Sequence, residues 1–410
     1  MHPPEFTAQP SPPLPGWELA HLPPAPIEGL YVHVPFCVHK CHYCDFYSIT
    51  RQAPQRMGRF VDLLLSETEQ WHESRSSELL KPQTVFFGGG TPSLLPLESM
   101  DRLLKGLKER IDLSGVQEWT VEVNPATANL EYCQMLRGHG VDRLSFGAQS
   151  FNLGELATLE RRHDPADVPR SIELAGRAGF GRLNLDLIYA VPGQSLESWS
   201  DSLEQALSLG TSHLSCYGLT YEPNTPMAVK KRLGLVRPAD ETLELEMMHH
   251  TRHRLARAGM PAYEISNFAL PGDQCRHNLV YWTGGNYLGL GPSAASHLEG
   301  RRWRNRPHLG EWEAAIASNR LPATDVEQLS PVMRAGELAM LMLRLASGLN
   351  FETFSARIGL DASALFPEPI ERLTRLGLVR DDGQAVVLTD AGLNVADAVS
   401  AEFLDASESD

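Results

Sequence analysis

The chain has 410 residues, with 51 acidic and 36 basic side chains and a formal net charge of −15 at pH 7. This length is sufficient for a large hydrophobic core and for more than one domain. The negative charge argues against a general nucleic-acid binder, because the phosphate backbone attracts basic surfaces.

No apolar run approaches the roughly twenty residues that a membrane-spanning helix needs. The N-terminus has no basic segment followed by an apolar one, so we predict no secretory signal. Six cysteines, three of them close together, are typical of a reducing compartment rather than of a disulfide framework. We therefore expect a cytoplasmic protein.

Residues 1–26 hold nine prolines and almost no periodic apolar pattern. Such a segment buries too little surface to offset the entropy that ordering costs, so we expect a flexible or extended tail. The folded part is expected to begin near residue 27.

Three cysteines follow the apolar run 30–36, which is typical of a short buried strand. Cys37, Cys41 and Cys44 are separated by three residues and then by two. A loop at a strand end lets a scaffold aim several side chains at one point, and thiolates so close together bind soft metals readily.

Three interpretations of these cysteines stay open at this point. An iron–sulfur cluster would take the three thiolates and leave one iron open to another ligand. Three unrelated thiols are the simplest alternative. A zinc site would need a fourth ligand, and the histidines near enough in sequence to supply it are His33, His39 and His42.

Strand-like and helix-like patterns alternate after residue 30, which predicts a parallel sheet with helices outside. Six such units, rather than eight, indicate an incomplete barrel, and in parallel barrels the chemistry gathers at the carboxyl ends of the strands. The predicted strands are 30–36, 84–87, 119–123, 143–146, 182–189 and 213–219, and the predicted helices lie near 57–72, 97–110, 129–138, 167–178 and 197–208.

Unusual residues occur at or near these strand ends. Three glycines at 88–90 follow a strand, and residues without a Cβ let the backbone approach a ligand, although a tight turn would need them too. Glu122 and Asp186 lie inside apolar strands, where a carboxylate is costly to bury without a positive or hydrogen-bonding partner. Either an internal ion pair or a cationic, hydroxyl-rich ligand would meet this need.

A second block, His277-Asn278-x-x-Tyr281-Trp282, lies further along the chain. Neutral imidazole is a good axial ligand of heme iron and aromatic rings can pack on a porphyrin, which makes His277 a candidate heme ligand, with ordinary packing as the alternative. The remaining cysteines are predicted to be buried core residues, and they are Cys133, Cys216 and Cys275.

Four arginines at 301, 302, 304 and 306 flank Trp303. A solvated basic turn is one interpretation, and an anchor for carboxylates such as heme propionates is the other. From about residue 325, helical patterns and a strand-like stretch at 385–388 predict a winged-helix-like domain. Because residues 351–410 hold 12 acidic and 4 basic side chains, we expect this domain to mediate interactions or to act as a lid rather than to bind DNA.

The cysteine motif after one strand, and Gly88-Gly89-Gly90-Thr91-Pro92 after the next, resemble the radical S-adenosylmethionine (SAM) superfamily. Within it the chain is similar to relatives of oxygen-independent coproporphyrinogen III oxidase, and among these to the HemW-type heme chaperones, from about residue 30 to the 390s. The resemblance implies that the three cysteines hold a [4Fe–4S] cluster, that SAM chelates the open iron, and that electron delivery to the sulfonium yields a 5′-deoxyadenosyl radical.

The same resemblance implies SAM-binding residues. Tyr31, Gly89, Glu122 and Ala295 match one SAM site, and Gly90, Thr91, Gln149, Arg161, Asp186 and Thr220 match a second. Phe46 stands where the oxidases have a further cysteine, and with the His277 block this favours heme binding and delivery over decarboxylation of coproporphyrinogen III. A zinc-binding structural protein is the weakest alternative, because zinc would not explain the glycines and both carboxylates together.

The resemblance also implies a domain order and partners. We predict a radical SAM core at 27–235, a core extension with the His277 block at 236–325, a C-terminal domain like that of the oxidases at 326–400 and an acidic tail at 401–410. The expected partners are heme, recipient hemoproteins and an electron donor such as flavodoxin or ferredoxin, with peripheral membrane contact and a monomer or homodimer left open.

Overall fold

The computed structural model describes residues 25–74 and 80–408. The predicted proline-rich tail lies outside the described residues except for its last two. Among the described residues, none of the helices combines the length and apolar character that crossing a membrane requires.

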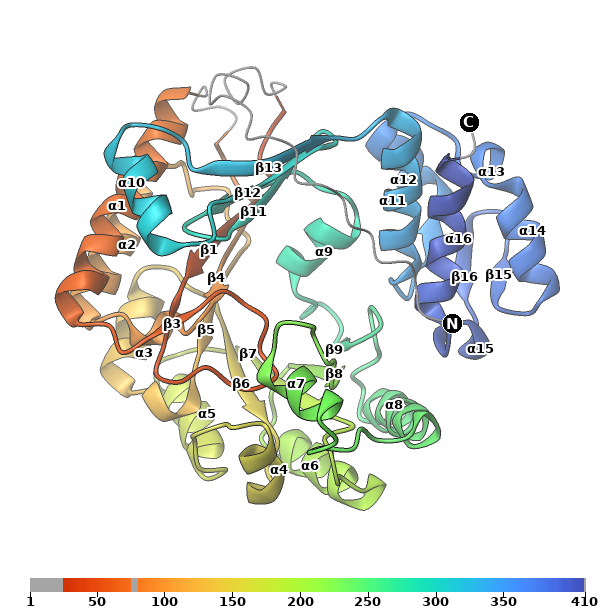
Figure 1. Cartoon of the computed structure of the whole chain (residues 1–410), viewed down its shortest axis with the longest axis horizontal. Coiled ribbons are helices and arrows are strands. Elements are labelled where there is room, and N and C mark those ends of the chain that lie inside the picture. Colours follow the sequence, from red (N-terminus) through yellow and green to blue (C-terminus); the bar gives the residue numbers. More distant parts are fainter. Residues whose placement is uncertain (1–24, 75–79, 409–410) are drawn as a thin grey trace.

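Within the described residues, an eleven-stranded sheet forms the centre of the molecule, in the order β13-β12-β11-β10-β1-β4-β5-β6-β7-β8-β9 (Figure 1). The edge strand β9 (Asn267–Ala269) pairs antiparallel with β8. The six predicted strands are all present and pair in parallel. They are β1 (Gly29–Val34), β4 (Thr84–Gly89), β5 (Glu118–Val123), β6 (Arg143–Gln149), β7 (Arg182–Tyr189) and β8 (His213–Gly218). Their mostly buried, apolar residues explain why they were recognisable in the sequence. The predicted α/β class with an incomplete parallel barrel is confirmed.

A seventh parallel strand, β10 (Tyr287–Leu290), pairs with β1 on the side away from β4 and was not predicted. Glycines at 284, 285, 289 and 291 interrupt the apolar pattern around it. At Gly289 a Cβ atom would meet the backbone of Ala295 on the next strand, so close strand packing requires glycine here.

Helices cover the outer face of the parallel strands (Figure 1). Each packs an apolar stripe on the sheet, as the buried Leu103, Leu104 and Leu107 of α2 illustrate. The helices are α1 (Pro54–Ser74), α2 (Leu97–Arg110), α3 (Leu130–Gly138), α5 (Asp167–Arg177), α6 (Leu196–Ser208) and α8 (Glu241–Arg257).

Antiparallel strands extend the sheet beyond β10 and change the interpretation of the four arginines. These strands are β11 (Ala295–Leu298), β12 (Arg301–Asn305) and β13 (Ala323–Gln328). The predicted basic turn is therefore a strand. Arg302 pairs with Glu327 and Glu337, and Arg304 with Asp325 at 2.9 Å. These carboxylates already neutralise two of the four guanidinium groups, those of Arg302 and Arg304, that the anchor hypothesis assigned to heme propionates.

Helix α9 (Arg276–Trp282), which carries the His277 block, closes the amino end of the parallel strands. The backbone amides of Arg276 and His277 each donate to the Glu118 carboxylate at 3.0 Å, and Glu118 is the first residue of β5. The His277 ring bonds to Thr84, the first residue of β4. The block therefore lies at the end of the barrel opposite to the cysteine loop.

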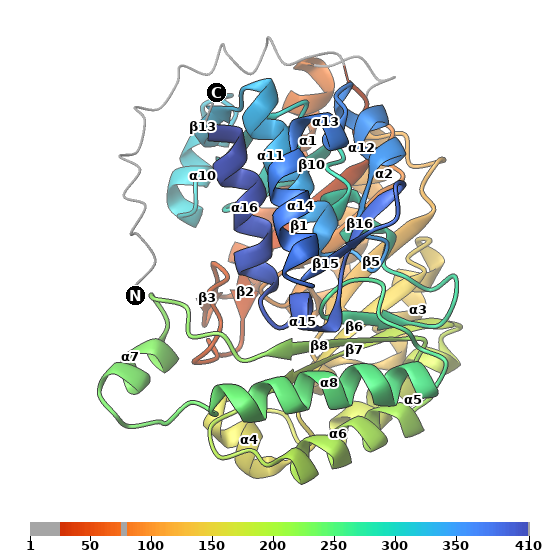
Figure 2. The same ribbon diagram turned by 90° about the vertical axis from the view of Figure 1, so that its right-hand side faces the viewer.

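The C-terminal region has its own hydrophobic core and packs in front of the sheet in the view of Figure 2. It contains α11 (Pro331–Leu343), α12 (Phe351–Ile358), α14 (Pro367–Arg375), α16 (Ala396–Glu408) and a three-stranded sheet of β14 (Leu349–Asn350), β16 (Ala385–Leu388) and β15 (Val379–Asp381). Residues 401–408, predicted as part of an acidic tail, instead continue α16. Val399 and Phe403 are buried in the domain core, which holds this helix in place.

Candidate functional site

A cavity of about 650 Å³ opens at the carboxyl ends of the parallel strands. Its size is in the range of small-molecule sites, and its position is where parallel barrels carry their chemistry. Eight of the ten residues predicted to bind SAM line it, together with one cluster cysteine, Cys44: they are Gly89, Gly90, Thr91, Glu122, Gln149, Arg161, Asp186 and Thr220.

The three cysteines lie on the loop that leaves β1. All are free thiols; Cys41 is buried, and Cys37 and Cys44 are half-buried. The Thr91 hydroxyl donates to Cys37 Sγ, and Arg161 Nη1 donates to Cys41 Sγ, both at 3.7 Å. Donors of this kind stabilise negatively charged sulfur, so the surroundings suit thiolates bound to iron.

The arrangement of the three cysteines indicates which kind of metal group they could hold. Among the described residues, no group of three or more His, Cys, Asp or Glu side chains is set for a single metal ion. A mononuclear zinc site needs its ligands to converge on one atom. Cysteines around a polynuclear cluster each bind a different iron, so they need not converge as closely. Three free thiols, two of them with hydrogen-bond donors at sulfur, fit the cysteine ligation of an iron–sulfur cluster.

The glycine run 88–90 packs against the backbone of the segment that leads into the cysteine loop. The amide of Gly90 donates to Val34 O at 2.8 Å, and that of Thr91 to Phe36 O at 2.7 Å. A Cβ atom on Gly90 would lie 2.7 Å from both Val34 O and Phe36 O. At Gly89, where φ is +98°, a Cβ would run into the His33 ring. Only residues without a Cβ atom allow the 88–90 segment to pack this closely against the start of the cysteine loop.

Four carboxylates line the cavity, those of Asp45, Glu122, Asp186 and Glu222, together with one arginine, Arg161. Burial and the nearby Asp186 carboxylate raise the pKa of Glu122 to about 8. The Gly89 amide and, more distantly, Arg143 and Arg161 oppose this shift. A cationic ligand beside Glu122 would replace the missing positive charge and return its pKa toward the usual range. The residues present therefore fit a sulfonium compound with an ammonium group.

Asp186 is held by a chain of buried hydrogen bonds inside the barrel. Its carboxylate accepts from Asn184 Nδ2 at 2.8 Å and from the Ser145 hydroxyl at 3.1 Å. Asn184 Oδ1 lies 2.6 Å from His213 Nδ1, and His213 Nε2 lies 2.9 Å from the Tyr263 hydroxyl. Burial lowers the pKa of His213 well below the usual value, so the ring is neutral and its Nδ1–H donates to Asn184. This chain fixes the direction in which Asp186 faces the cavity.

The structure does not bring every predicted residue to the cavity. Tyr31 lies below it on β1, with its hydroxyl 3.1 Å from His33 Nδ1 and its ring stacked on Phe86. Ala295 is exposed on β11, separated from β4 by β10 and β1. Neither residue is among those that line the cavity.

Several lining residues were missed in the sequence. Ser145 and Gly147 lie on β6, four and two residues before Gln149, respectively, and Ile188 follows Asp186 by two on β7. The two-residue period of a strand would have placed them on the same face as the residues that were identified. Tyr217 lies near the end of β8 and also lines the cavity, but no residue of β8 had been predicted as a site residue, so the sequence did not indicate which face of this strand meets the ligand.

His277 does not face this cavity. Its ring is 1% exposed, Nδ1 lies 2.8 Å from the Thr84 hydroxyl, and Nε2 lies 2.7 Å from the Tyr281 hydroxyl. The ring also stacks on Phe86, with centroids 5.3 Å apart. Burial lowers its pKa to about 3, so the ring is neutral. Both nitrogens are engaged, so binding iron through this ring would require the loss of one of these hydrogen bonds.

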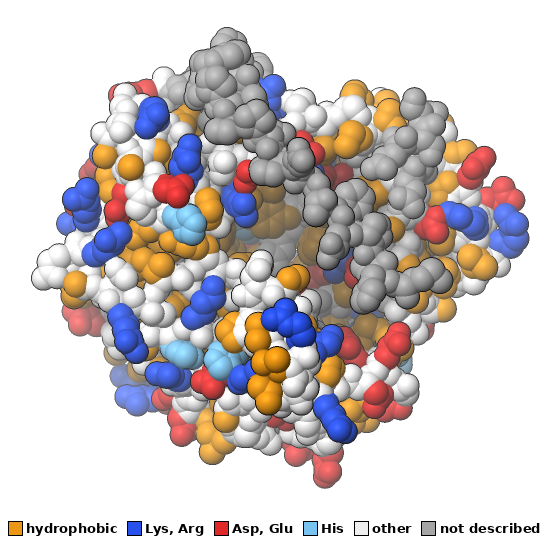
Figure 3. All heavy atoms as spheres, in the orientation of Figure 1, with side chains coloured by type: hydrophobic (Ala, Val, Ile, Leu, Met, Phe, Trp, Pro, Cys, Tyr) orange, Lys and Arg blue, Asp and Glu red, His pale blue; other side chains and the backbone are white. Residues whose placement is uncertain are grey.

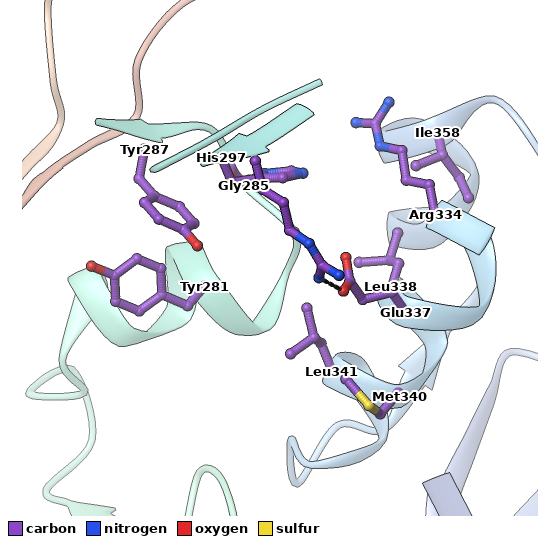
Figure 4. A pocket seen from close by; sticks show the side chains of 12 residues that line it. Tyr281, Gly285, Tyr287, His297, Arg334, Glu337, Leu338, Met340, Leu341 and Ile358 are labelled. Atoms are coloured by element: carbon purple, nitrogen blue, oxygen red, sulfur yellow. Dashed lines mark hydrogen bonds and ion pairs between the residues drawn. The ribbon is translucent and has the colours of Figure 1, made fainter. Parts of the chain in front are cut away.

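A second, smaller cavity of about 220 Å³ lies between α9, the antiparallel strands and α11. Tyr281 and Tyr287 face it from one side, and Leu338, Met340 and Leu341 from the other (Figure 4). Its volume is below the roughly 300–1,000 Å³ of typical small-molecule pockets. In this arrangement the cavity does not fit a porphyrin.

Comparison with known proteins agrees with this geometry. A family model described as the radical SAM superfamily matches residues 31–206, and one described as the HemN C-terminal domain matches residues 329–395. A protein named heme chaperone HemW from Lactococcus lactis is 34% identical over 375 residues, covering 91% of this chain and 96% of that protein. The protein of that name from Mycobacterium tuberculosis is 36% identical and covers 94% and 96%, respectively.

The solved structure of coproporphyrinogen III oxidase (HemN) from Escherichia coli, described as a radical SAM enzyme, superimposes with a TM-score of 0.80. The match covers 94% of this chain and 92% of the oxidase, at 23% sequence identity. At this identity the comparison establishes a shared fold.

Proposed function

The chain belongs to the HemW heme-chaperone family of the radical SAM superfamily, and from this premise we propose that it binds a [4Fe–4S] cluster, SAM and heme and delivers the heme to hemoproteins. One observation supports the cofactor assignment most strongly. The loop with the three free cysteines reaches one cavity through Cys44, and the glycine run and the half-buried Glu122 and Asp186 carboxylates line the same cavity.

Each group in this cavity has a proposed task. When bound, the cluster supplies an open iron to SAM and one-electron chemistry. Cys37, Cys41 and Cys44 hold it, and the donors from Thr91 and Arg161 stabilise the thiolates. The glycine backbone and Glu122 receive the positively charged end of SAM, and Asp186 receives a hydroxyl or cationic group.

The test of this assignment is anaerobic reconstitution with iron and sulfide. We expect iron–sulfur absorbance that SAM perturbs in the electron paramagnetic resonance spectrum of the reduced protein. Replacing any of Cys37, Cys41 or Cys44 by serine is expected to abolish it. Cys133→Ala serves as the control, because Cys133 is buried on α3 away from the cavity. A colourless protein, or a cluster that SAM does not perturb, would contradict the proposal.

Heme delivery and porphyrinogen decarboxylation are separated by a paired assay on one reconstituted sample. We expect heme to bind, and no protoporphyrinogen IX to form from coproporphyrinogen III with SAM and a reductant. Measurable turnover would move the assignment to the oxidase.

A further inference from the structure

A basic surface lies beside the cysteine loop, on α7 (Pro226–Arg232) and the segment that follows it. Residues 226–237 contain four basic side chains and no acidic one, although the whole chain has a net charge of −15. The α7 surface, as we define it, consists of Lys230, Lys231, Arg232, Leu233, Leu235 and Arg237.

The same surface is unusually apolar for an exposed segment. Leu233 and Leu235 are 64% and 70% exposed, and on the cysteine loop Val38 and Phe46 are 61% and 65% exposed. Figure 3 shows hydrophobic and basic side chains together over the position that α7 occupies in Figure 1. Exposed apolar side chains gathered with charges of one sign mark a contact surface.

Specific contacts hold the α7 surface against the cysteine loop. The Met227 amide donates to His42 O at 2.9 Å, and His42 lies between Cys41 and Cys44. The Met227 side chain is buried in a small apolar cluster against which Tyr43, also on the loop, packs. The Lys231 ammonium lies 4.5 Å from the centroid of the Tyr221 ring. The α7 surface therefore lies in direct contact with the loop that carries the proposed cluster ligands.

We propose that the α7 surface docks an acidic electron-transfer protein that reduces the cluster. The inference rests on the proposed function, in which the cluster supplies one-electron chemistry: in each transfer the donor's cofactor is oxidised by one electron and the cluster is reduced by one. Electron transfer needs the donor close to the cysteine loop, and complementary charge steers a negative partner to a basic surface at this position. A membrane is the alternative partner for a basic and apolar surface, but membrane binding does not require a position beside the cysteine loop. Amphipathic helices that bind membranes are also usually much longer than the seven residues of α7.

The test uses the full-length, cluster-loaded protein and a flavodoxin as the probe, with affinity measured by titration calorimetry at several salt concentrations. Reversing three charges in the variant Lys230→Glu, Lys231→Glu, Arg232→Glu is expected to weaken binding about tenfold or more and to reduce its salt dependence. The matched control is Arg170→Glu, Arg257→Glu, Arg320→Glu, three exposed arginines elsewhere with the same change in net charge. We expect the control to bind within about twofold of the unmodified protein.

Equal affinities of the two triple variants would overturn the proposal. So would binding of the unmodified protein to vesicles containing phosphatidylglycerol, but not to flavodoxin, since this would make the surface a membrane contact. Iron–sulfur absorbance and its perturbation by SAM are recorded on the same samples. Failure of the cofactor assignment would remove these signals, whereas failure of the docking proposal would leave them intact.

Discussion

Glu122 is the residue whose protonation depends most directly on whether the cavity is filled. Because burial and Asp186 raise its pKa to about 8, it is mostly protonated at pH 7 without a ligand. A bound cation favours the carboxylate and lowers the pKa. We therefore expect SAM to bind more tightly as the pH rises from 6 through about 8, with release of a proton near pH 7.

The measurement is calorimetry of SAM binding in two buffers that differ in ionisation enthalpy. In Glu122→Gln, proton release should disappear and affinity should fall by about tenfold or more at high pH, since a neutral amide cannot meet the positive charge. Glu131→Gln, an acidic residue in the first turn of α3, is the control. Persistent proton release in Glu122→Gln would assign the titration to another group.

His277 gives a second prediction for a single residue. Replacing it with alanine removes two buried hydrogen bonds and a stacked ring, so we expect the free energy of unfolding to fall by about 2–4 kcal/mol. The exposed His253 on α8 is the control, with an expected change within about 0.5 kcal/mol. The heme absorption spectrum of the same variant tests whether His277 binds iron. If His277 is a heme ligand, as the sequence predicted, this spectrum should change.

At the scale of elements, the buried Glu67 connects helix α1 to β12, to α10 (Leu309–Ala317) and to the residue that follows β10. Its carboxylate accepts from the Gly291 amide at 2.8 Å, Asn305 Nδ2 at 2.6 Å and Trp312 Nε1 at 3.1 Å. These donors follow β10, end β12 and lie on α10, respectively. None carries a charge, so burial dominates and raises the pKa of Glu67 to about 8.

This contact predicts a pH dependence of stability. Between the usual pKa near 4.5 and the folded value of about 8, the folded protein binds more protons than the unfolded chain. The free energy of unfolding should therefore fall as the pH rises through this window, by up to about 1.4 kcal/mol per pH unit. Glu67→Gln should flatten the dependence measured by urea unfolding, whereas Glu73→Gln, exposed on the same helix, should not.

The predictions made from the sequence differ in quality between elements for physical reasons. The six parallel strands were recognised because most of their residues are buried and many of these are apolar, which leaves a compositional signal even where polar residues interrupt it. Strand β10 was missed because close packing against β11 demands glycine, and glycine weakens that signal. The arginines of β12 were taken for a turn because the carboxylates that pair with them, on β13 and α11, follow some twenty or more residues later.

At the scale of the whole molecule, Arg302 connects the sheet to the C-terminal domain. It pairs with Glu327 on the neighbouring strand and with Glu337 on α11, and Figure 4 shows the second of these contacts. Arg302→Ala should loosen α11, so we expect faster hydrogen–deuterium exchange in the first turns of that helix. Arg304→Ala is the matched control, because Arg304 pairs with Asp325 within the sheet. Equal exchange in both variants would show that Arg302 does not hold the domains together.

The sequence by itself determined the parallel barrel, the cysteine loop and the glycine run at the large cavity, because these are encoded by local patterns: apolar strands, cysteine spacing and glycines at a strand end. Only the tertiary structure decided that the His277 block closes the opposite end of the barrel with both ring nitrogens engaged, and that the basic α7 surface lies against the cysteine loop. These relations depend on contacts between residues far apart in the chain, such as His277 with Thr84 and Met227 with His42. Local pattern carries no information about such pairs, because the fold alone brings them together.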